Sequence, residues 1–252
     1  SVGTLNLLND PTWPHRRELV VTALADADAD VVALQEVSYI SAGDLVESLP
    51  QYDFIGADRG DGTQLTGLLV KKGRFCEKGE TTFVYTSTTT GLYDADTQRP
   101  RPVVCDRLHN RTEDGRKGSA VTVCSVHISG ENYEGVMAEL RVALGNEAGL
   151  VLAGDFNQLP GPNPWMQPGA PAFEGWLDDA FVEAGVVVPM DCVDGPVNAA
   201  CMAMSTSPEG QFDSRIDLVL TAPAFTAVDA HVAAKASTGL SDHPLMVTTL
   251  VQ

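Results

Sequence analysis

The sequence lacks the features that would divide it or place it in a membrane. Among its 252 residues there is no run of about 18 apolar residues, which argues against a membrane-spanning helix. It also has no charged-then-apolar leader, no repeat, no low-complexity tract and no obvious linker. We therefore expect a monomeric single domain over residues 1–252, without stable membrane insertion, whose core draws on an apolar share of 44%.

Basic residues are scarce, at 16 Lys and Arg against 34 Asp and Glu. The resulting formal charge of −18 argues against broad, nonspecific binding of polyanions. Ten of the 16 nevertheless lie between residues 71 and 117, against seven acids, so this segment carries +3 and the remainder −21. The asymmetry predicts a local basic face, with a solvated hairpin of mixed charge as the alternative.

Cysteines number only five, and none stands in a CxxC or His-spaced cluster, which argues against structural zinc. If the turn-rich segment between them closes a symmetric hairpin, Cys105 and Cys124 face each other across it. Cys192 and Cys201 bracket a short loop suited to a second disulfide. Two bridges with Cys76 left over would suit a secreted, extracellular protein, whereas five buried thiols are the alternative.

Strand-like and helix-like segments follow one another without a strict βαβ order, and this predicts an α/β sandwich. Helical spacing or composition marks residues 11–30, 132–148 and 173–185. We expect strands at residues 3–8, 31–37, 67–75, 150–156, 214–222 and 241–251, with a hairpin over residues 105–124.

The stretch LVLAGDFNQLP, residues 150–160, runs from an apolar strand into a carboxylate and a carboxamide. Side chains two apart on an extended chain point the same way, so we expect Asp155 and Asn157 to project together from the strand end. Either ordinary turn hydrogen bonds or a ligand must satisfy these two polar groups.

Other strand-like segments carry polar residues near an end in the same way. Each has an ordinary structural explanation, but buried carboxylates are costly unless they are paired or bound to a metal. The polar residues at these strand ends are best explained if the ends converge on one pocket. Oxygen ligands in that pocket would suit Mg²⁺, Mn²⁺ or Ca²⁺. Two histidines left off the metal would serve proton transfer and anion stabilisation, which suits hydrolysis of a phosphate ester. Besides Asp155 and Asn157, the residues are Asn6, Glu36, His127, Asp217, Asp242 and His243.

Six ordered motifs resemble those of the endonuclease/exonuclease/phosphatase superfamily, to which deoxyribonuclease I belongs. They are TLNLL, LQEV, VHIS, GDFN, RIDLVL and SDHPLM, and they span residues 6 to 243. The resemblance implies a four-layer α/β sandwich of two mostly antiparallel sheets flanked by helices. It also implies that the protein hydrolyses phosphate esters by water attack and depends on a divalent metal.

The resemblance assigns parts to the residues that would hold the metal and the water. Glu36 is similar to the principal metal ligand, with Asn6 helping to build the metal site and Asp242 as a further ligand. Asp155 and Asn157 resemble the pair that orients the attacking water and touches the phosphate.

The resemblance also implies a proton-transfer pair and phosphate contacts. His243 is similar to the general base, with Asp217 holding its ring, and His127 to the imidazole that donates to a phosphate oxygen. Arg101 resembles an arginine that contacts substrate phosphate in nucleases, although Arg99 competes for this register.

The expected substrate is a nucleic acid, DNA or RNA, because the basic segment 71–117, the cysteine pairs and the compact length fit a secreted nuclease. A sphingomyelinase-like phospholipase C is one alternative, in which Trp165 and Met166 on a Pro-rich loop would contact phospholipid. A catalytically silent binding module with the same fold is another, and the intact set of polar residues argues against it.

Overall fold

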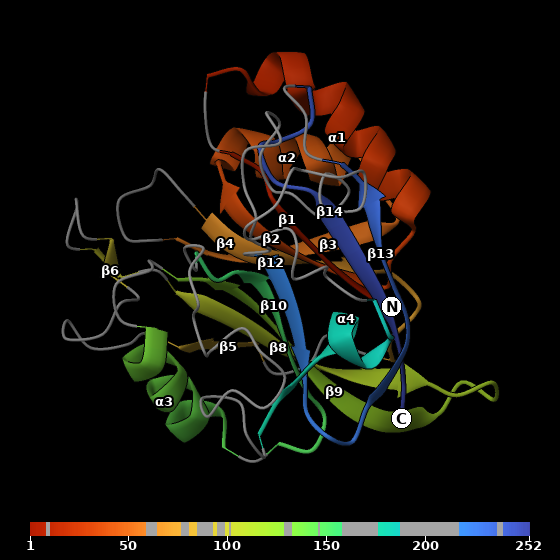
Figure 1. Ribbon diagram of the computed structural model, residues 1–252. Helices are drawn as coiled ribbons and strands as arrows, with labels where there is room; N and C mark the ends of the chain where they lie inside the picture. Colours follow the sequence, from red (N-terminus) through yellow and green to blue (C-terminus); the bar gives the residue numbers. More distant parts are fainter. Residues whose placement is uncertain are drawn as a thin grey trace.

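The computed structural model describes residues 1–8, 11–58, 65–76, 81–84, 93–94, 99–100, 102–128, 133–145, 147–157, 176–186, 217–235 and 239–252. Two six-stranded sheets lie face to face at its centre (Figure 1). Helices α1 (Trp13–Ala27) and α2 (Tyr39–Ser48) cover the outside of one sheet, and α3 (Tyr133–Leu144) covers the outside of the other. The four-layer α/β sandwich expected from the sequence is confirmed.

The first sheet has the strand order β13-β14-β1-β2-β4-β3, and its parallel pair is β1 with β2. The other neighbouring strands of this sheet run antiparallel. The strands are β1 (Val2–Asn6), β2 (Val31–Val37), β3 (Tyr52–Asp58), β4 (Leu65–Lys71), β13 (Thr226–Ala234) and β14 (Leu245–Val251).

The second sheet has the strand order β11-β12-β10-β9-β8-β5, and its parallel pair is β9 with β10. Its other neighbours are antiparallel, so both sheets are mostly antiparallel, as expected. The strands are β5 (Thr81–Val84), β8 (Val103–Arg111), β9 (Lys117–His127), β10 (Leu150–Asp155), β11 (Asp178–Asp179) and β12 (Asp217–Thr221). A separate two-residue pair joins β6 (Tyr93–Asp94) to β7 (Arg99–Pro100).

Helix α1 follows the prediction from its sequence. Pro14 lies in the first turn, where a missing backbone donor costs nothing. Asp28 adopts the left-handed conformation and ends the helix, its N–H donating to the Leu24 carbonyl. Val20 and Leu24, four residues apart, are buried in the cluster between this helix and the first sheet.

The predicted helix over residues 173–185 is wrong for most of its described part. Residues 178–179 form the edge strand β11, and helix α4 (Ala180–Glu183) is a single turn. The apolar residues of this segment serve two different layers. Trp176 and Leu177 belong to the cluster outside the second sheet, whereas Ala180 and Phe181 belong to clusters on its other side. The segment therefore crosses the sheet edge, and its apolar spacing does not indicate one helical face.

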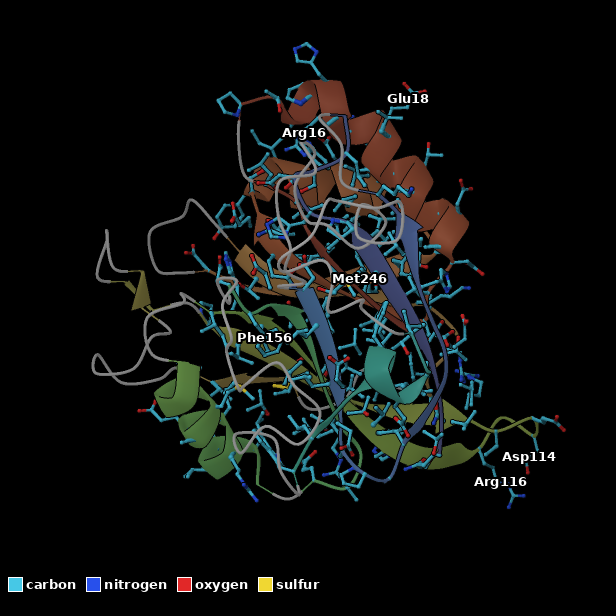
Figure 2. All side chains as sticks on the ribbon, in the orientation of Figure 1. Arg16, Glu18, Asp114, Arg116, Phe156 and Met246 are labelled. Carbon is cyan, nitrogen blue, oxygen red and sulfur yellow. A yellow bond between two sulfur atoms is a disulfide. The ribbon has the colours of Figure 1, made fainter. Side chains whose placement is uncertain are left out.

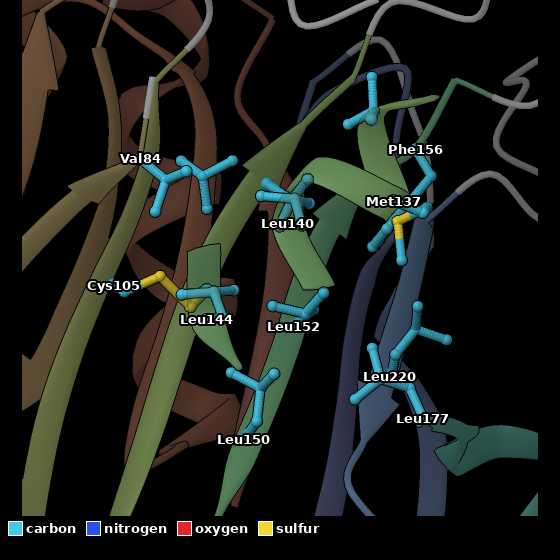
Figure 3. Packing of buried hydrophobic residues seen from close by; sticks show 14 of the residues in the cluster. Val84, Cys105, Met137, Leu140, Leu144, Leu150, Leu152, Phe156, Leu177 and Leu220 are labelled. Carbon is cyan, nitrogen blue, oxygen red and sulfur yellow. A yellow bond between two sulfur atoms is a disulfide. The ribbon is translucent and has the colours of Figure 1, made fainter. Parts of the chain in front are cut away.

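The cluster outside the second sheet packs α3 against β9, β10 and β12 (Figure 3). Within it, a disulfide joins Cys105 and Cys124, which occupy directly opposed positions of β8 and β9. The predicted hairpin and its disulfide are thus confirmed. Cys76 is a free thiol, and the predicted pair Cys192–Cys201 lies outside the described residues.

The layer between the two sheets changes from apolar to polar along the strands. Alternate residues of each strand face this layer, and toward one end they form a cluster of mainly Val, Ala and Leu side chains. Toward the other end the inward positions are polar and still buried. They are Thr4, Asn6, Gln35, Ser125, His127, Asp155 and Asp217. This polar end of the layer is where the predicted site residues lie.

Candidate active site

Strand register places three predicted site residues side by side in the second sheet. Asp155, the last residue of β10, pairs with His127 on the parallel neighbour β9. On its other side it pairs with Asp217 on the antiparallel neighbour β12. All three are buried, and their strands carry them to the same edge of the sheet.

The first sheet contributes Asn6 and Glu36 from the ends of β1 and β2. The Asn6 amide nitrogen donates to Asp155 Oδ2 at 3.0 Å and to Glu36 Oε1 at 3.1 Å. Its amide oxygen accepts the Leu8 N–H at 2.9 Å. Asn6 therefore holds two carboxylates together across the gap between the sheets, and its oxygen is already engaged.

Glu36 reaches the site because β2 contains a bulge. Leu34 pairs with Gly67 and Val37 with Leu65, so three steps along β2 match two along β4. Glu36 has a positive φ of 52°, a conformation that is unfavourable for a residue with a side chain. Regular alternation after the inward Gln35 would turn Glu36 to the outer face, whereas the bulge brings its carboxylate to Asn6.

His243 precedes β14 in the first sheet and reaches across to the second. Its Nδ1 lies 2.9 Å from Asp217 Oδ2, and both side chains are buried. Its Nε2 lies 3.7 Å from Asp155 Oδ2 and 3.9 Å from Asp242 Oδ1. The carboxylate of Asp217 thus fixes the imidazole ring with its other nitrogen toward the acidic cluster.

The two sheets also meet at His127. Its Nε2 lies 3.6 Å from Asp155 Oδ2 and 3.9 Å from Glu36 Oε1. Asp155 Oδ2 therefore has Asn6 and both histidines around it. The predicted convergence of the strand ends on one site is what the structure shows for the described residues.

Burial and charge perturb the central acid and base. Burial and, after it, the neighbouring charge of Asp217 raise the pKa of Asp155 to about 7 against the opposing effect of His243. Burial alone would lower the pKa of His243, but the charge and hydrogen bond of Asp217 raise it to about 10. Without a cation, this cluster therefore holds protons strongly.

The geometric argument for Asn157 is wrong, although the residue lies beside the site. Strand β10 ends at Asp155, and Asn157 has a left-handed φ of 47°, so the two side chains are not alternate residues of one extended strand. Instead the Asn157 backbone N–H donates to Asp155 Oδ1 at 2.8 Å, a turn bond that fixes the carboxylate. Arg101 and the side chain of Arg99, the alternative residue for the same motif position, lie outside the described residues.

Gly154 is needed for the close approach of β10 to β9. A Cβ on this residue would lie 1.9 Å from the Val126 carbonyl oxygen, far inside contact distance. Because both groups belong to the backbone, no side-chain movement relieves that clash. The Gly before Asp155 thus lets the acid take its place between the neighbouring strands.

Two basic residues of segment 71–117, Lys71 and Arg116, lie away from the site. Lys71 is the last residue of β4 and lies beside the start of β2, whereas Glu36 lies near the other end of β2. The Lys71 Nζ atom lies 2.7 Å from Asp28 Oδ1. Arg116 lies at the tip of the β8–β9 hairpin in contact with Asp114, far from Phe156, the residue after the site carboxylate (Figure 2). The contact of Arg116 with Asp114 fits the alternative, a hairpin of mixed charge, and the basic face stays a prediction.

Sequence reasoning missed the side chains that connect the site to its surroundings. Gln35 Nε2 donates to Ser125 Oγ at 3.1 Å, which joins the two sheets beside Glu36 and His127. Ser241 Oγ donates to the Asn6 carbonyl at 2.6 Å and accepts the His243 N–H at 3.2 Å. Polar residues at inward strand positions were the available signal for the first pair.

The donor set suits a hard divalent cation. Glu36 and Asp155 supply carboxylate oxygens around one point, and burial makes ionised Asp155 costly without a nearby positive charge. Atoms of Asp155, Asp217 and His243 also lie within 4.8 Å of one another. Because Asp217 and His243 already bond each other at 2.9 Å, that group is better suited to proton transfer than to holding the ion. One oxygen of Asp217, Oδ1, is buried without a hydrogen-bond partner in the described part of the chain.

Comparison with solved structures gives full-length matches to the fold. An endonuclease/exonuclease/phosphatase from Bacteroides vulgatus has a TM-score of 0.71 at 18% identity, covering 99% of this chain and 97% of that chain. A mannosyl-6-phosphatase from Bacteroides thetaiotaomicron has a TM-score of 0.69 at 21% identity, covering 100% and 99%. D. rerio TDP2, complexed with a single-strand DNA product, has a TM-score of 0.67 at 19% identity, covering 100% and 98%.

These identities show a shared fold rather than a shared substrate. No curated protein matches the sequence. None of the described helices is long and apolar enough to cross a membrane. Residues 3–243, nearly the whole chain, match the Endonuclease/Exonuclease/phosphatase family, and the chain belongs to that family.

Proposed function

We propose that this protein hydrolyses phosphate esters with a divalent cation, through attack by a water molecule that His243 activates. The observation that carries the proposal is the Asp217–His243 pair. It is buried, its atoms are 2.9 Å apart, and its free nitrogen faces Asp155 at 3.7 Å. A histidine held in one tautomer by a carboxylate, beside acids that suit a cation, is the arrangement expected of a general base.

Proton transfer is the part we assign to His243 and Asp217. Asp217 accepts the hydrogen on Nδ1, which leaves Nε2 as the atom that takes the proton of the attacking water. After Asp217, the charges of Asp155 and Asp242 also raise the pKa of His243, so neutralising these two acids favours the unprotonated base. General-base assistance of this kind contributes about 10²- to 10⁴-fold in rate.

Glu36 is the residue we propose as the main holder of the cation, with Asp242 as a further ligand. The Glu36 side chain is 24% exposed and that of Asp242 47%, so both can be reached from solvent. Asn6 helps to build this site by holding Glu36 and Asp155 in place. Mg²⁺ is the proposed ion, with Mn²⁺ and Ca²⁺ as alternatives, and when bound it neutralises phosphate charge and stabilises the charge that develops.

Phosphate positioning falls to His127, Asp155 and Asn157 in this proposal. His127 would donate to a phosphate oxygen, and Asp155 with Asn157 would orient the water and contact the phosphate. The position of His127 Nε2, 3.6 Å from Asp155 Oδ2, supports the first part. Arg101 remains a proposed phosphate contact on its sequence motif alone.

A phosphodiester of DNA or RNA is the substrate we propose. A structural neighbour with a single-strand DNA product supports this choice, as does the intact family motif set. A small phosphomonoester is the second candidate, because Lys71 and Arg116 of the basic segment lie away from the site and pair with acids there. A neighbouring structure is a mannosyl-6-phosphatase. For the phospholipase alternative, Trp165 and Met166 lie outside the described residues.

We further propose a monomeric single catalytic domain over residues 1–252 that acts outside the cell. The buried Cys105–Cys124 disulfide supports an oxidising compartment. Secretion of the protein with this bond formed, measured by thiol labelling of the natively expressed chain, is the expected result. A fully labelled pair would contradict the location.

The test is a substrate panel with matched histidine variants. Plasmid DNA, RNA, sphingomyelin, bis(p-nitrophenyl) phosphate and a sugar phosphate are incubated with Mg²⁺, Mn²⁺ or Ca²⁺ and with a chelator. We expect chelation to abolish hydrolysis and His243→Ala to lower turnover about 10²- to 10⁴-fold. The control is His231→Ala, because His231 pairs with Asp229 at the same 2.9 Å but is exposed on β13. Full activity of His243→Ala, or activity that survives the chelator, would refute the proposal.

A further inference from the structure

Arg16 is a buried arginine outside the polar cluster, on the face of α1 that packs on the first sheet. It is 3% exposed, and it shares the buried stripe of the helix with Val20 and Leu24. A charged side chain in such a position requires well-placed partners, since removing its hydration is costly. Its neighbour Arg17 is partly exposed on the same helix.

The guanidinium of Arg16 bonds to two segments that are far apart in sequence. One nitrogen, Nη1, donates to the Leu7 carbonyl at 2.9 Å and to the Leu240 carbonyl at 2.6 Å. The other, Nη2, donates to the Leu8 carbonyl at 2.6 Å. Its Nε donates to Thr12 Oγ1 at 2.9 Å, which fixes the direction of the side chain.

Both segments carry proposed site residues at their ends. Leu7 and Leu8 directly follow Asn6, and Leu240 is followed by Ser241, Asp242 and His243. Leu8 has a left-handed φ of 53°, so the chain leaves β1 in a conformation that needs outside support. The Ser241 hydroxyl, which donates to the Asn6 carbonyl at 2.6 Å, is a second tie between the same segments.

We propose that Arg16 is a positioning residue for the hydrolysis assigned above, on which this inference rests. By holding Leu7, Leu8 and Leu240 it sets Asn6 and His243 at a fixed separation. Asn6 and His243 both address Asp155 of the other sheet, so an error in their separation is an error in the reacting geometry. A displacement of about 1 Å at such a site lowers turnover by about 10²-fold.

A lysine cannot reproduce this arrangement. Its ammonium is a compact charge, whereas the planar guanidinium presents several donors in a rigid fork. Arg16→Lys keeps the buried charge and the hydrophobic stem but cannot reach three carbonyls in the same geometry. It is therefore the variant of choice, and Arg16→Met tests the loss of the charge itself.

The experiment compares Arg16→Lys and Arg16→Met with Arg17→Met and the wild-type protein. Arg17 Nη2 donates to Ser48 Oγ at 2.9 Å on the surface, so its loss controls for a missing arginine on α1. Hydrolysis of bis(p-nitrophenyl) phosphate with Mg²⁺ gives kcat and KM. Amide hydrogen exchange, followed residue by residue, reports on Leu8 and His243 without any substrate.

We expect Arg16→Lys to lower kcat about 10- to 100-fold with KM changed less than about threefold. The amides of Leu8 and His243 should exchange at least about tenfold faster, while those of the sheet cores keep their protection. Arg17→Met should match the wild type in both measurements. If Arg16→Met fails to fold, Arg16→Lys alone decides.

Two results would overturn the inference while leaving the proposed function intact. One is an Arg16→Lys variant that equals Arg17→Met in kcat. The other is a fall in kcat without any local change in exchange, which would locate the effect elsewhere. An inactive wild-type protein toward the whole substrate panel would refute the proposed function, and the positioning role with it. Normal wild-type activity with an indifferent Arg16→Lys would refute the positioning role alone.

Discussion

We expect the Asp217–His243 pair to make the stability of the metal-free protein fall as pH rises. The pKa of His243 is raised from 6.5 to about 10, chiefly by Asp217 acting against the effect of burial. Between these values the folded protein keeps a proton that the unfolded chain has released. The stabilisation is therefore complete below pH 6.5 and is lost as pH rises through 10. Asp155, with its pKa raised from 3.8 to about 7, adds a decline of the same sign at lower pH.

The expected slope of the free energy of unfolding against pH follows from one proton. A difference of one bound proton between folded and unfolded states changes the free energy of unfolding by about 1.4 kcal/mol per pH unit. Between about pH 8 and 9, where Asp155 is at least about nine-tenths ionised, His243 should account for a loss of about 1.4 kcal/mol. His243 is deeply buried beside its partner, so solvent screens this effect little.

Urea unfolding in the presence of a chelator measures this slope, with Asp217→Asn as the matched variant. The amide keeps an acceptor for His243 Nδ1 but removes the charge, so burial then leaves the imidazole neutral throughout the window. We expect the slope of the variant to be smaller than that of the wild type by about 1.4 kcal/mol per pH unit. Groups that do not interact with the pair titrate equally in both proteins and cancel. The slopes are compared above pH 8 because the pKa of Asp155 also depends on Asp217 and His243. Equal slopes would refute the electrostatic role of Asp217.

Three further outcomes are expected. Gly154→Ala should lower the free energy of unfolding by about 3 kcal/mol or more, because its Cβ would lie 1.9 Å from the Val126 carbonyl; an unchanged urea midpoint would contradict the strand contact. Replacing Cys105 and Cys124, which are 19 residues apart in sequence, by Ala should lower the free energy of unfolding by about 3 kcal/mol in urea; an unchanged free energy would contradict the stabilising role of the disulfide. Saturating Mg²⁺ should lower the pKa of His243 in an NMR titration, since it neutralises acids that raise it; an unchanged pKa would place the ion elsewhere.

The site could be predicted from the sequence because its residues break a strong rule. Inward positions of buried strands are normally apolar, so Asp155, Asp217 and His127 at such positions require a common explanation. Their order in the motifs identified the family as well. What the motifs could not give is the register that sets His127 and Asp217 on either side of Asp155, because pairing between distant strands is a tertiary property.

Local departures from regular geometry account for the errors. Alternation along an extended chain misplaces Asn157, since this residue adopts a left-handed backbone conformation. Helix α2 was not predicted, and it begins with a reciprocal capping box between Ser38 and Ser41 rather than with a clear apolar stripe. The edge strand β13 was missed because alternating small and exposed residues give little hydrophobic signal.

The sequence position of Arg16 indicates a buried charge, a signal that the sequence-based prediction did not use. It stands four residues before Val20 and eight before Leu24, so it falls on the buried stripe of α1, whereas Arg17 does not. A charged residue inside an apolar stripe predicts a buried partner on the structure that the helix covers. The sequence alone could not name that partner, because backbone carbonyls of Leu7, Leu8 and Leu240 carry no sequence signature.

The geometry of the site depends on the distance between the two sheets, because groups from both meet at Asp155. A cavity in the layer between the sheets should therefore affect activity as well as stability. Val123 faces that layer and Val126 faces the outer cluster, and both are fully buried on β9. Either Val→Ala change should cost about 2 kcal/mol in unfolding. Only Val123→Ala should also lower kcat, although Val126 is nearer to His127 in sequence. Equal losses of kcat in the two variants would show that the spacing of the sheets does not set the reacting geometry.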